Sequence, residues 1–175
     1  SWDETVRVWS QGTLECLKQW NSGVRAFSLA LAGDLVCVGG DGGALNVWKW
    51  DSKADAAATC IAELKGHTGL VSKLEVDSTR HRLLSAAADQ KLIVWDLLKW
   101  TECSRFEHTD GLYNVVLHMP GAEHPGITYF SDAVGSIGRW NVGGESLVNS
   151  WKAHGKGEQG TQVTSLLLLP DALVS

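Results

Sequence analysis

The sequence predicts an all-β protein built from about four copies of one unit, and three observations carry this prediction. Four short apolar segments end in tryptophan, at spacings of 39, 47 and 45 residues: Trp9, Trp48, Trp95 and Trp140. An aspartate precedes each tryptophan by six to eight residues: Asp3, Asp41, Asp89 and Asp132. The chain of 175 residues also holds 19 glycines and only three prolines, which favours many tight turns between short strands. Self-similarity at a fixed period is the sequence signature of a repeat architecture.

Each unit divides into four short strands separated by turn residues. In the unit 58–95 we expect strands at 60–64, 70–76, 82–86 and 91–95, and in the unit 13–48 at 14–17, 24–31, 34–38 and 44–48. Neither unit contains a convincing 3.6-residue apolar period, which argues against helices. A third unit covers 102–140, and partial units cover 1–9 and 146–175, so the whole chain, 1–175, is interpreted as one repeat segment.

The order of motifs within the unit 58–95 points to a known architecture. Four strands per period of about 40–45 residues, with Gly-His before and Trp-Asp after, are typical of a β-propeller blade. The pairs stand here as Gly66-His67 and Trp95-Asp96. On these residues the sequence resembles the WD-repeat family. The resemblance implies a WD-repeat β-propeller of roughly four blades, a partial ring of what we expect to be a seven-bladed propeller. The remaining blades of a longer protein would close the ring and cover its edge strands. Closure as four blades alone, or pairing with another chain as two partial rings, stays open as an alternative.

Ser85, His67 and Asp89 are the residue types of a hydrolase triad. The resemblance implies instead a structural network in which the turn aspartate contacts the loop histidine, the histidine contacts the strand hydroxyl, and the hydroxyl accepts from the Trp95 indole. A buried hydroxyl and a buried indole need such partners. The unit 102–140 offers His108, Thr128, Asp132 and Trp140 for the same network. The unit 13–48 has Asn21 and Cys37 at the matching places, so we expect it to lack the network and form a looser blade.

Other chemistry-bearing residues lack the spacing of a reactive site. The four cysteines form no C-x-x-C pair, and the remaining histidines lack metal-ligand spacing. The glycine-rich run 39–43 precedes no predicted helix that would bind phosphate, so we interpret it as a turn. We therefore expect no enzyme activity, no metal and no cofactor. Reduced cysteines favour an intracellular location, cytoplasmic or nuclear. No apolar run is long enough to span a membrane, and the net charge of −5 argues against nucleic acid as a partner.

The loops around each Gly-His position and each turn aspartate are expected to share one rim of the propeller. The candidate partner-binding residues on this rim are Trp2, Trp20, Leu70, Leu112 and Tyr113. Trp2 would either anchor an interface or pack under a neighbouring loop, and the sequence leaves both open. Residues 118–126 are an insertion on the opposite rim, and 152–161 form a second long loop on the first rim.

These observations favour a non-catalytic scaffold that mediates protein–protein interactions in an intracellular multiprotein complex. Two alternatives remain at this point. One is a propeller associated with RNA or a ribonucleoprotein, and the other is the substrate-recognition module of a ubiquitin ligase. Leu97 and Leu98 follow Trp95-Asp96, so the arginine of that ligase subfamily's W-D-x-R motif is missing.

Overall fold

The computed structural model describes residues 1–51, 58–109, 112–118, 126–142, 146–154, 163, 165–169 and 172–174. For 112–118 and parts of the last two strands the description is limited to the backbone. The described residues contain sixteen strands and one short 3-10 turn, Asp41–Gly43, and no α-helix lies among them.

Twelve strands form three four-stranded antiparallel sheets in which neighbours in sequence are neighbours in space. The first sheet contains β3 (Ala26–Ala32), β4 (Leu35–Gly40), β5 (Leu45–Lys49) and β6 (Thr59–Glu63). The second contains β7 (Val71–Asp77), β8 (Arg82–Ala87), β9 (Lys91–Asp96) and β10 (Thr101–Glu107). The third contains β11 (Leu112–His118), β12 (Ile127–Asp132), β13 (Ser136–Asn141) and β14 (Ser146–Lys152). Two-stranded sheets flank them: β1 (Thr5–Trp9) with β2 (Cys16–Asn21), and β15 (Leu167–Leu169) with β16 (Ala172–Val174).

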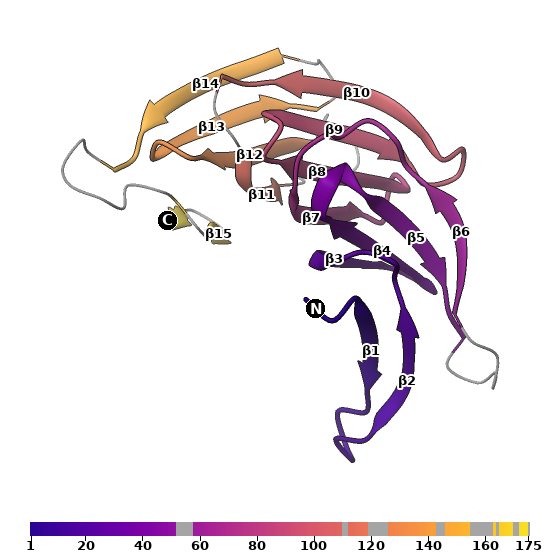
Figure 1. Cartoon of the computed structure of the whole chain (residues 1–175). Coiled ribbons are helices and arrows are strands. Elements are labelled where there is room, and N and C mark those ends of the chain that lie inside the picture. Colours follow the sequence, from indigo (N-terminus) through magenta and orange to yellow (C-terminus); the bar gives the residue numbers. More distant parts are fainter. Residues whose placement is uncertain are drawn as a thin grey trace.

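The sheets follow one another around an open arc (Figure 1). The first strands β3, β7 and β11 lie next to each other on the inside of the arc, and β6, β10 and β14 lie on the outside. The pair β1–β2 takes the place of the two outer strands of a sheet, and β15–β16 the place of the two inner ones. This arrangement confirms the all-β propeller fold class.

The sequence units and the sheets are offset by one strand. The unit 58–95 contributes β6 to the sheet before it, where Cys60 lies opposite Trp48, and its other three strands begin the next sheet. Trp48, Trp95 and Trp140 therefore lie one residue before the end of the third strand of their sheets, and Trp9 ends β1. Because a unit spans two sheets, the chain itself ties neighbouring sheets together.

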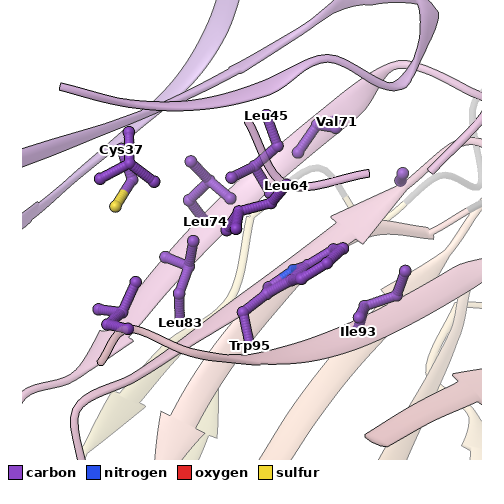
Figure 2. Close-up of a cluster of buried hydrophobic side chains, with 11 residues drawn as sticks. Cys37, Leu45, Leu64, Val71, Leu74, Leu83, Ile93 and Trp95 are labelled. Carbon is purple, nitrogen blue, oxygen red and sulfur yellow. The ribbon is translucent and has the colours of Figure 1, made fainter. Parts of the chain in front are cut away.

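The hydrophobic core lies between successive sheets rather than inside any one of them. Figure 2 shows the cluster in which Trp95, Leu83 and Ile93 of the second sheet face Cys37 and Leu45 of the first. A second cluster joins the second and third sheets around Phe130 and Trp140. Because both faces of a middle strand are covered, β8 and β9 are almost continuously buried. This burial explains why these strands lack a polar–apolar alternation in the sequence.

Candidate functional site

Four side chains around the second sheet form one continuous hydrogen-bond network. His67 comes from the loop between β6 and β7, Ser85 from β8, Asp89 from the β8–β9 turn and Trp95 from β9. The Nδ1 atom of His67 lies 3.1 Å from each carboxylate oxygen of Asp89, and its Nε2 atom lies 2.7 Å from Ser85 Oγ. The indole of Trp95 donates to Ser85 Oγ at 2.8 Å. The structure thus brings together the four residues expected in this unit.

Burial determines how protons are arranged in this network. It lowers the pKa of His67, and the neighbouring Asp89 carboxylate only partly opposes the shift. A neutral imidazole donates from Nδ1 to Asp89 and accepts the Ser85 hydroxyl proton at Nε2, which leaves Ser85 Oγ free to accept from Trp95. Asp89 also accepts from the backbone N–H of Thr68 at 2.8 Å. The Ser85 side chain is fully buried, so its hydroxyl ties structure together and is not placed to attack a substrate.

The glycine before His67 is required by the position of the Trp95 ring. A Cβ atom on Gly66 would lie 2.8 Å from the Trp95 ring and 3.2 Å from Ile93. The loop therefore passes directly over the indole. This contact gives a physical reason for the Gly-His pair at this point of the repeat.

The buried neutral His67 is expected to make the protein less stable at mildly acidic pH. Its pKa is lowered in the folded state, whereas an unfolded histidine titrates near about pH 6.5. The unfolded state therefore binds more protons below that pH, and the free energy of unfolding should decrease as the pH falls from about 7 to about 5. Urea unfolding across this range measures the effect.

The matched comparison is His67→Gln, which removes the titrating imidazole and should reduce the slope. The lowered pKa of Asp132 acts at more acidic pH and does not overlap this window. The pKa of Glu75, raised by burial, acts with the opposite sign but is common to both proteins. Equal slopes for the wild type and His67→Gln between about pH 5 and about pH 7 would contradict a neutral His67.

The third sheet does not repeat the complete network. His108 Nε2 lies 3.1 Å from Asp132 Oδ2, as expected. The buried indole nitrogen of Trp140 has no hydrogen-bond partner among the described residues, so the expected link from Thr128 to Trp140 is missing. Strand register gives the reason. Ser85 lies opposite the residue two before Trp95, whereas Thr128 lies directly opposite Trp140.

An aromatic cluster takes the place of the polar network in the third sheet. Phe130, opposite Gly138, occupies the position that corresponds to Ser85. Its ring centroid lies 5.3 Å from those of both Phe106 and His108, and Phe106 lies 5.8 Å from Trp140. Such contacts stabilise a core through burial and ring geometry rather than through hydrogen bonds.

The first sheet lacks the network, as expected. Asn21 and Cys37, however, are not the residues that stand at the matching places. The strand register places Val38 where Ser85 stands in the second sheet, because each lies opposite the residue two before the tryptophan of its sheet. Ser22 corresponds to His67, because each lies four residues before the first paired residue of its sheet, which is Ala26 in the first sheet and Val71 in the second. The indole nitrogen of Trp48 is buried and has no partner among the described residues. That this blade is looser stays a prediction.

Trp2 forms an exposed aromatic surface on the rim that carries the loop before β3. Its side chain is 73% exposed. The ring centroid of Phe27 lies 5.9 Å from that of Trp2, and the Arg25 guanidinium lies 5.9 Å from the Trp2 ring. Asp41 holds Arg25 in place through contacts of 2.6 and 2.8 Å. We call Trp2, Arg25 and Phe27 the aromatic rim surface. Sequence reasoning missed Arg25 and Phe27 because nothing in the repeat pattern distinguishes them.

The other rim candidates have different positions. Trp20 is wrong as a rim residue: it is only 7% exposed and its ring centroid lies 6.1 Å from that of Trp48. It lies opposite Val6 on the buried face of the β1–β2 pair. Leu70 is half-buried. The side chains of Leu112 and Tyr113, and most of 118–126 and 152–161, lie outside the described residues.

The described residues limit two further kinds of site. None of their helices is both long enough and apolar enough to cross a membrane. Among the same residues, no group of three or more His, Cys, Asp or Glu side chains gathers closely enough to hold a metal ion.

Comparison with known proteins finds one matching repeat in the chain. Residues 58–96 match the family described as "WD domain, G-beta repeat". The "Ribosome biogenesis protein WDR12 homolog" of Trichoplax adhaerens is 24% identical over 168 residues, which cover 86% of this chain and 37% of that protein. The chain thus spans little more than a third of the curated relative.

Two solved structures share the fold. A chain of the mitotic checkpoint complex superposes with a TM-score of 0.81 and 20% identity, over 98% of this chain and 50% of that one. The computationally designed Ika8 protein superposes with a TM-score of 0.74 and 21% identity, over 99% of this chain and 49% of that one. At these identities the likeness shows the fold alone. The arc of sheets corresponds to about half of each of these chains.

Proposed function

We propose that this chain, which carries a WD repeat within a partial WD-repeat propeller, is a non-catalytic scaffold that binds other proteins in an intracellular complex. The observation that carries the proposal is the exposed Trp2, whose ring lies near both Arg25 and Phe27. The name of the curated relative supports a complex that acts in ribosome biogenesis. We infer an intracellular location, in the cytoplasm or the nucleus.

The aromatic rim surface is pre-organised in a way that suits a protein partner. Asp3, next to Trp2, accepts hydrogen bonds from the Thr5 backbone and hydroxyl at 3.0 and 2.8 Å. These bonds lower the pKa of Asp3 to about 2 and fix the turn that carries Trp2. The Arg25–Asp41 contacts fix the guanidinium beside the ring. Exposed tryptophan and arginine are the residue types most enriched among interface hot spots, and a rigid surface loses less entropy on binding.

The absence of catalysis is also part of the proposal. The constellation of Ser85, His67 and Asp89 resembles a hydrolase triad, but its serine is fully buried and its hydroxyl is already bonded to His67 and Trp95. Function must be argued from a site rather than from residue types. The geometry of these residues favours a structural role.

Trp2→Ala is expected to weaken binding of at least one partner by about tenfold or more, the loss typical of an interface anchor. The measurement is quantitative affinity purification of the full-length protein from cells, with partners identified by mass spectrometry. Leu98→Ala is the matched control, because Leu98 is equally exposed but lies in the β9–β10 turn. Identical partner sets for wild type and Trp2→Ala would contradict the proposed docking surface.

A ribonucleoprotein role is the second candidate, favoured by the name of the curated relative. Nuclease treatment before the purification separates the two. Partners that persist after nuclease and depend on Trp2 support direct protein binding. Partners that all disappear with nuclease support association through RNA.

A further inference from the structure

The Trp2 ring of the aromatic rim surface is open to a group from outside the chain. Trp2 is 73% exposed, although two side chains lie beside its ring. The Phe27 ring is tilted by 57° with 5.9 Å between the two centroids, and the Arg25 guanidinium carbon lies 5.9 Å from the Trp2 centroid. These neighbours cover little of the indole, so most of its surface remains available for stacking.

Arg25 shows which kind of group this ring accepts. A guanidinium within about 6 Å of an indole centroid is attracted by the negative face of the ring. Arg25 meets this distance while its Nε and Nη2 atoms lie 2.8 and 2.6 Å from Asp41 Oδ2. One guanidinium thus contacts a ring and a carboxylate at the same time. A guanidinium from a partner can repeat this combination on the uncovered part of the ring.

The charged side chains around the aromatic rim surface have an excess of negative charge. Arg25 is paired with Asp41, and Arg7 is paired with Asp3 at 3.3 Å. Glu4 lies in the same turn, is exposed and has no ion pair among the described residues. Because complementary charges favour the right partner and like charges exclude the wrong one, this surface favours a cation over a carboxylate.

Arginine suits such an exposed surface better than lysine does. The guanidinium is planar, is more weakly hydrated than an ammonium, and carries several N–H donors in the plane of the group. It can therefore lie against the Trp2 indole and still donate to a carboxylate. The lysine ammonium is a compact, strongly hydrated charge, so its contact with the ring costs more hydration.

We propose that the aromatic rim surface binds an arginine side chain in a basic segment of a partner protein. The guanidinium stacks on the exposed part of the Trp2 ring, and the Glu4 carboxylate balances its charge. This inference rests on the proposed protein-binding function and adds the chemistry of the partner to it.

The test titrates the protein with an acetylated peptide amide of three Arg-Gly repeats and follows the indole N–H resonance of Trp2 by ¹⁵N NMR, assigned with Trp2→Phe. The proposal expects a saturable shift of this resonance. The same peptide with citrulline in place of arginine keeps the shape but lacks the charge, and should bind at least about fivefold more weakly. The corresponding lysine peptide should also bind more weakly than the arginine peptide.

A charge-removing variant tests the role of the carboxylate. Glu4→Gln should weaken binding of the arginine peptide about two- to threefold and leave the citrulline peptide unchanged. Glu15→Gln, also exposed but at the opposite end of the β1–β2 pair, is the matched control and should change neither. No saturable shift in the wild type, or an unchanged affinity in Glu4→Gln, would overturn the proposal. So would equal binding of the arginine and citrulline peptides, or tighter binding of the lysine peptide or of an aspartate peptide.

These outcomes are separable from those that test the proposed function. If Trp2→Ala loses partners in the affinity purification but the peptides bind equally, the surface docks a protein through other contacts and only the arginine is wrong. If Trp2→Ala loses no partner, the proposed docking function fails whatever the peptides show.

Discussion

Gly138→Ala is expected to destabilise the protein by about 2–3 kcal/mol through overpacking. A Cβ atom on Gly138 would lie 2.1 Å from the end of the Phe130 ring and 2.5 and 2.7 Å from its neighbouring atoms. The ring has no space to retreat, because Phe130 is fully buried against Phe106 and His108. Chemical unfolding in urea measures the change as a lower midpoint with an unchanged slope.

The matched control is a double-mutant cycle with Phe130→Val. Valine lacks the ring atoms that conflict with the new methyl group, so Gly138→Ala should cost much less in the Phe130→Val background than alone. The coupling between two residues in contact is expected to reach about 1–2 kcal/mol. If the two substitutions change the free energy of unfolding additively, contact with the Phe130 ring is not what restricts this position to glycine.

The periodicity of the tryptophans, together with the turn aspartates and the Gly-His and Trp-Asp pairs, predicted the fold class. Because Trp48, Trp95 and Trp140 lie near the end of the third strand of their sheets, their positions depend on strand pairing and on the packing between sheets. Trp95 and Trp140 are both almost completely buried at equivalent places. Variable turn lengths between the units do not disturb this pattern, since turns lie at the surface and tolerate insertion.

The details of the network could not be predicted as reliably, because they depend on register. The expected equivalence of Thr128 with Ser85 rests on counting back from the turn aspartate. Asp132 lies two residues farther from its tryptophan than Asp89 does, and that difference places Phe130 opposite the second residue before Trp140. The residues that the register places alike, Ser85, Phe130 and Val38, each lie ten residues before their tryptophan, so the count from the aspartate fails where the turn length varies.

The misplacement of Trp20 has a related cause. The repeat alignment placed it next to the Gly-His position, where a loop residue would be exposed. The structure instead places Trp20 within β2, on the side of the β1–β2 pair that packs against the first sheet. A shift of one residue moves a side chain to the opposite face of a strand. The accuracy with which the ends of loops and strands can be placed from the sequence therefore limits any prediction of rim residues.

Ser85→Ala is expected to cost about 2 kcal/mol, because it leaves two buried groups unsatisfied. Removing the hydroxyl takes the acceptor from the Trp95 indole at 2.8 Å and the donor from His67 Nε2 at 2.7 Å. The site is completely buried, so water cannot easily replace the lost partner. The free energy of unfolding from urea titration at neutral pH measures the loss.

Trp95→Phe is the control that separates hydrogen bonding from packing. It removes the indole donor along with part of the ring, so Ser85→Ala should cost less in the Trp95→Phe background than in the wild type. In the third sheet, Thr128→Val should produce no comparable coupling with Trp140→Phe, because the indole nitrogen of Trp140 has no hydrogen-bond partner among the described residues. Equal coupling energies in the second and third sheets would mean that the stabilisation attributed to the Ser85 hydroxyl does not come from its hydrogen bonds. A difference would show that one polar network, present in a single unit, holds the His67 loop over its sheet.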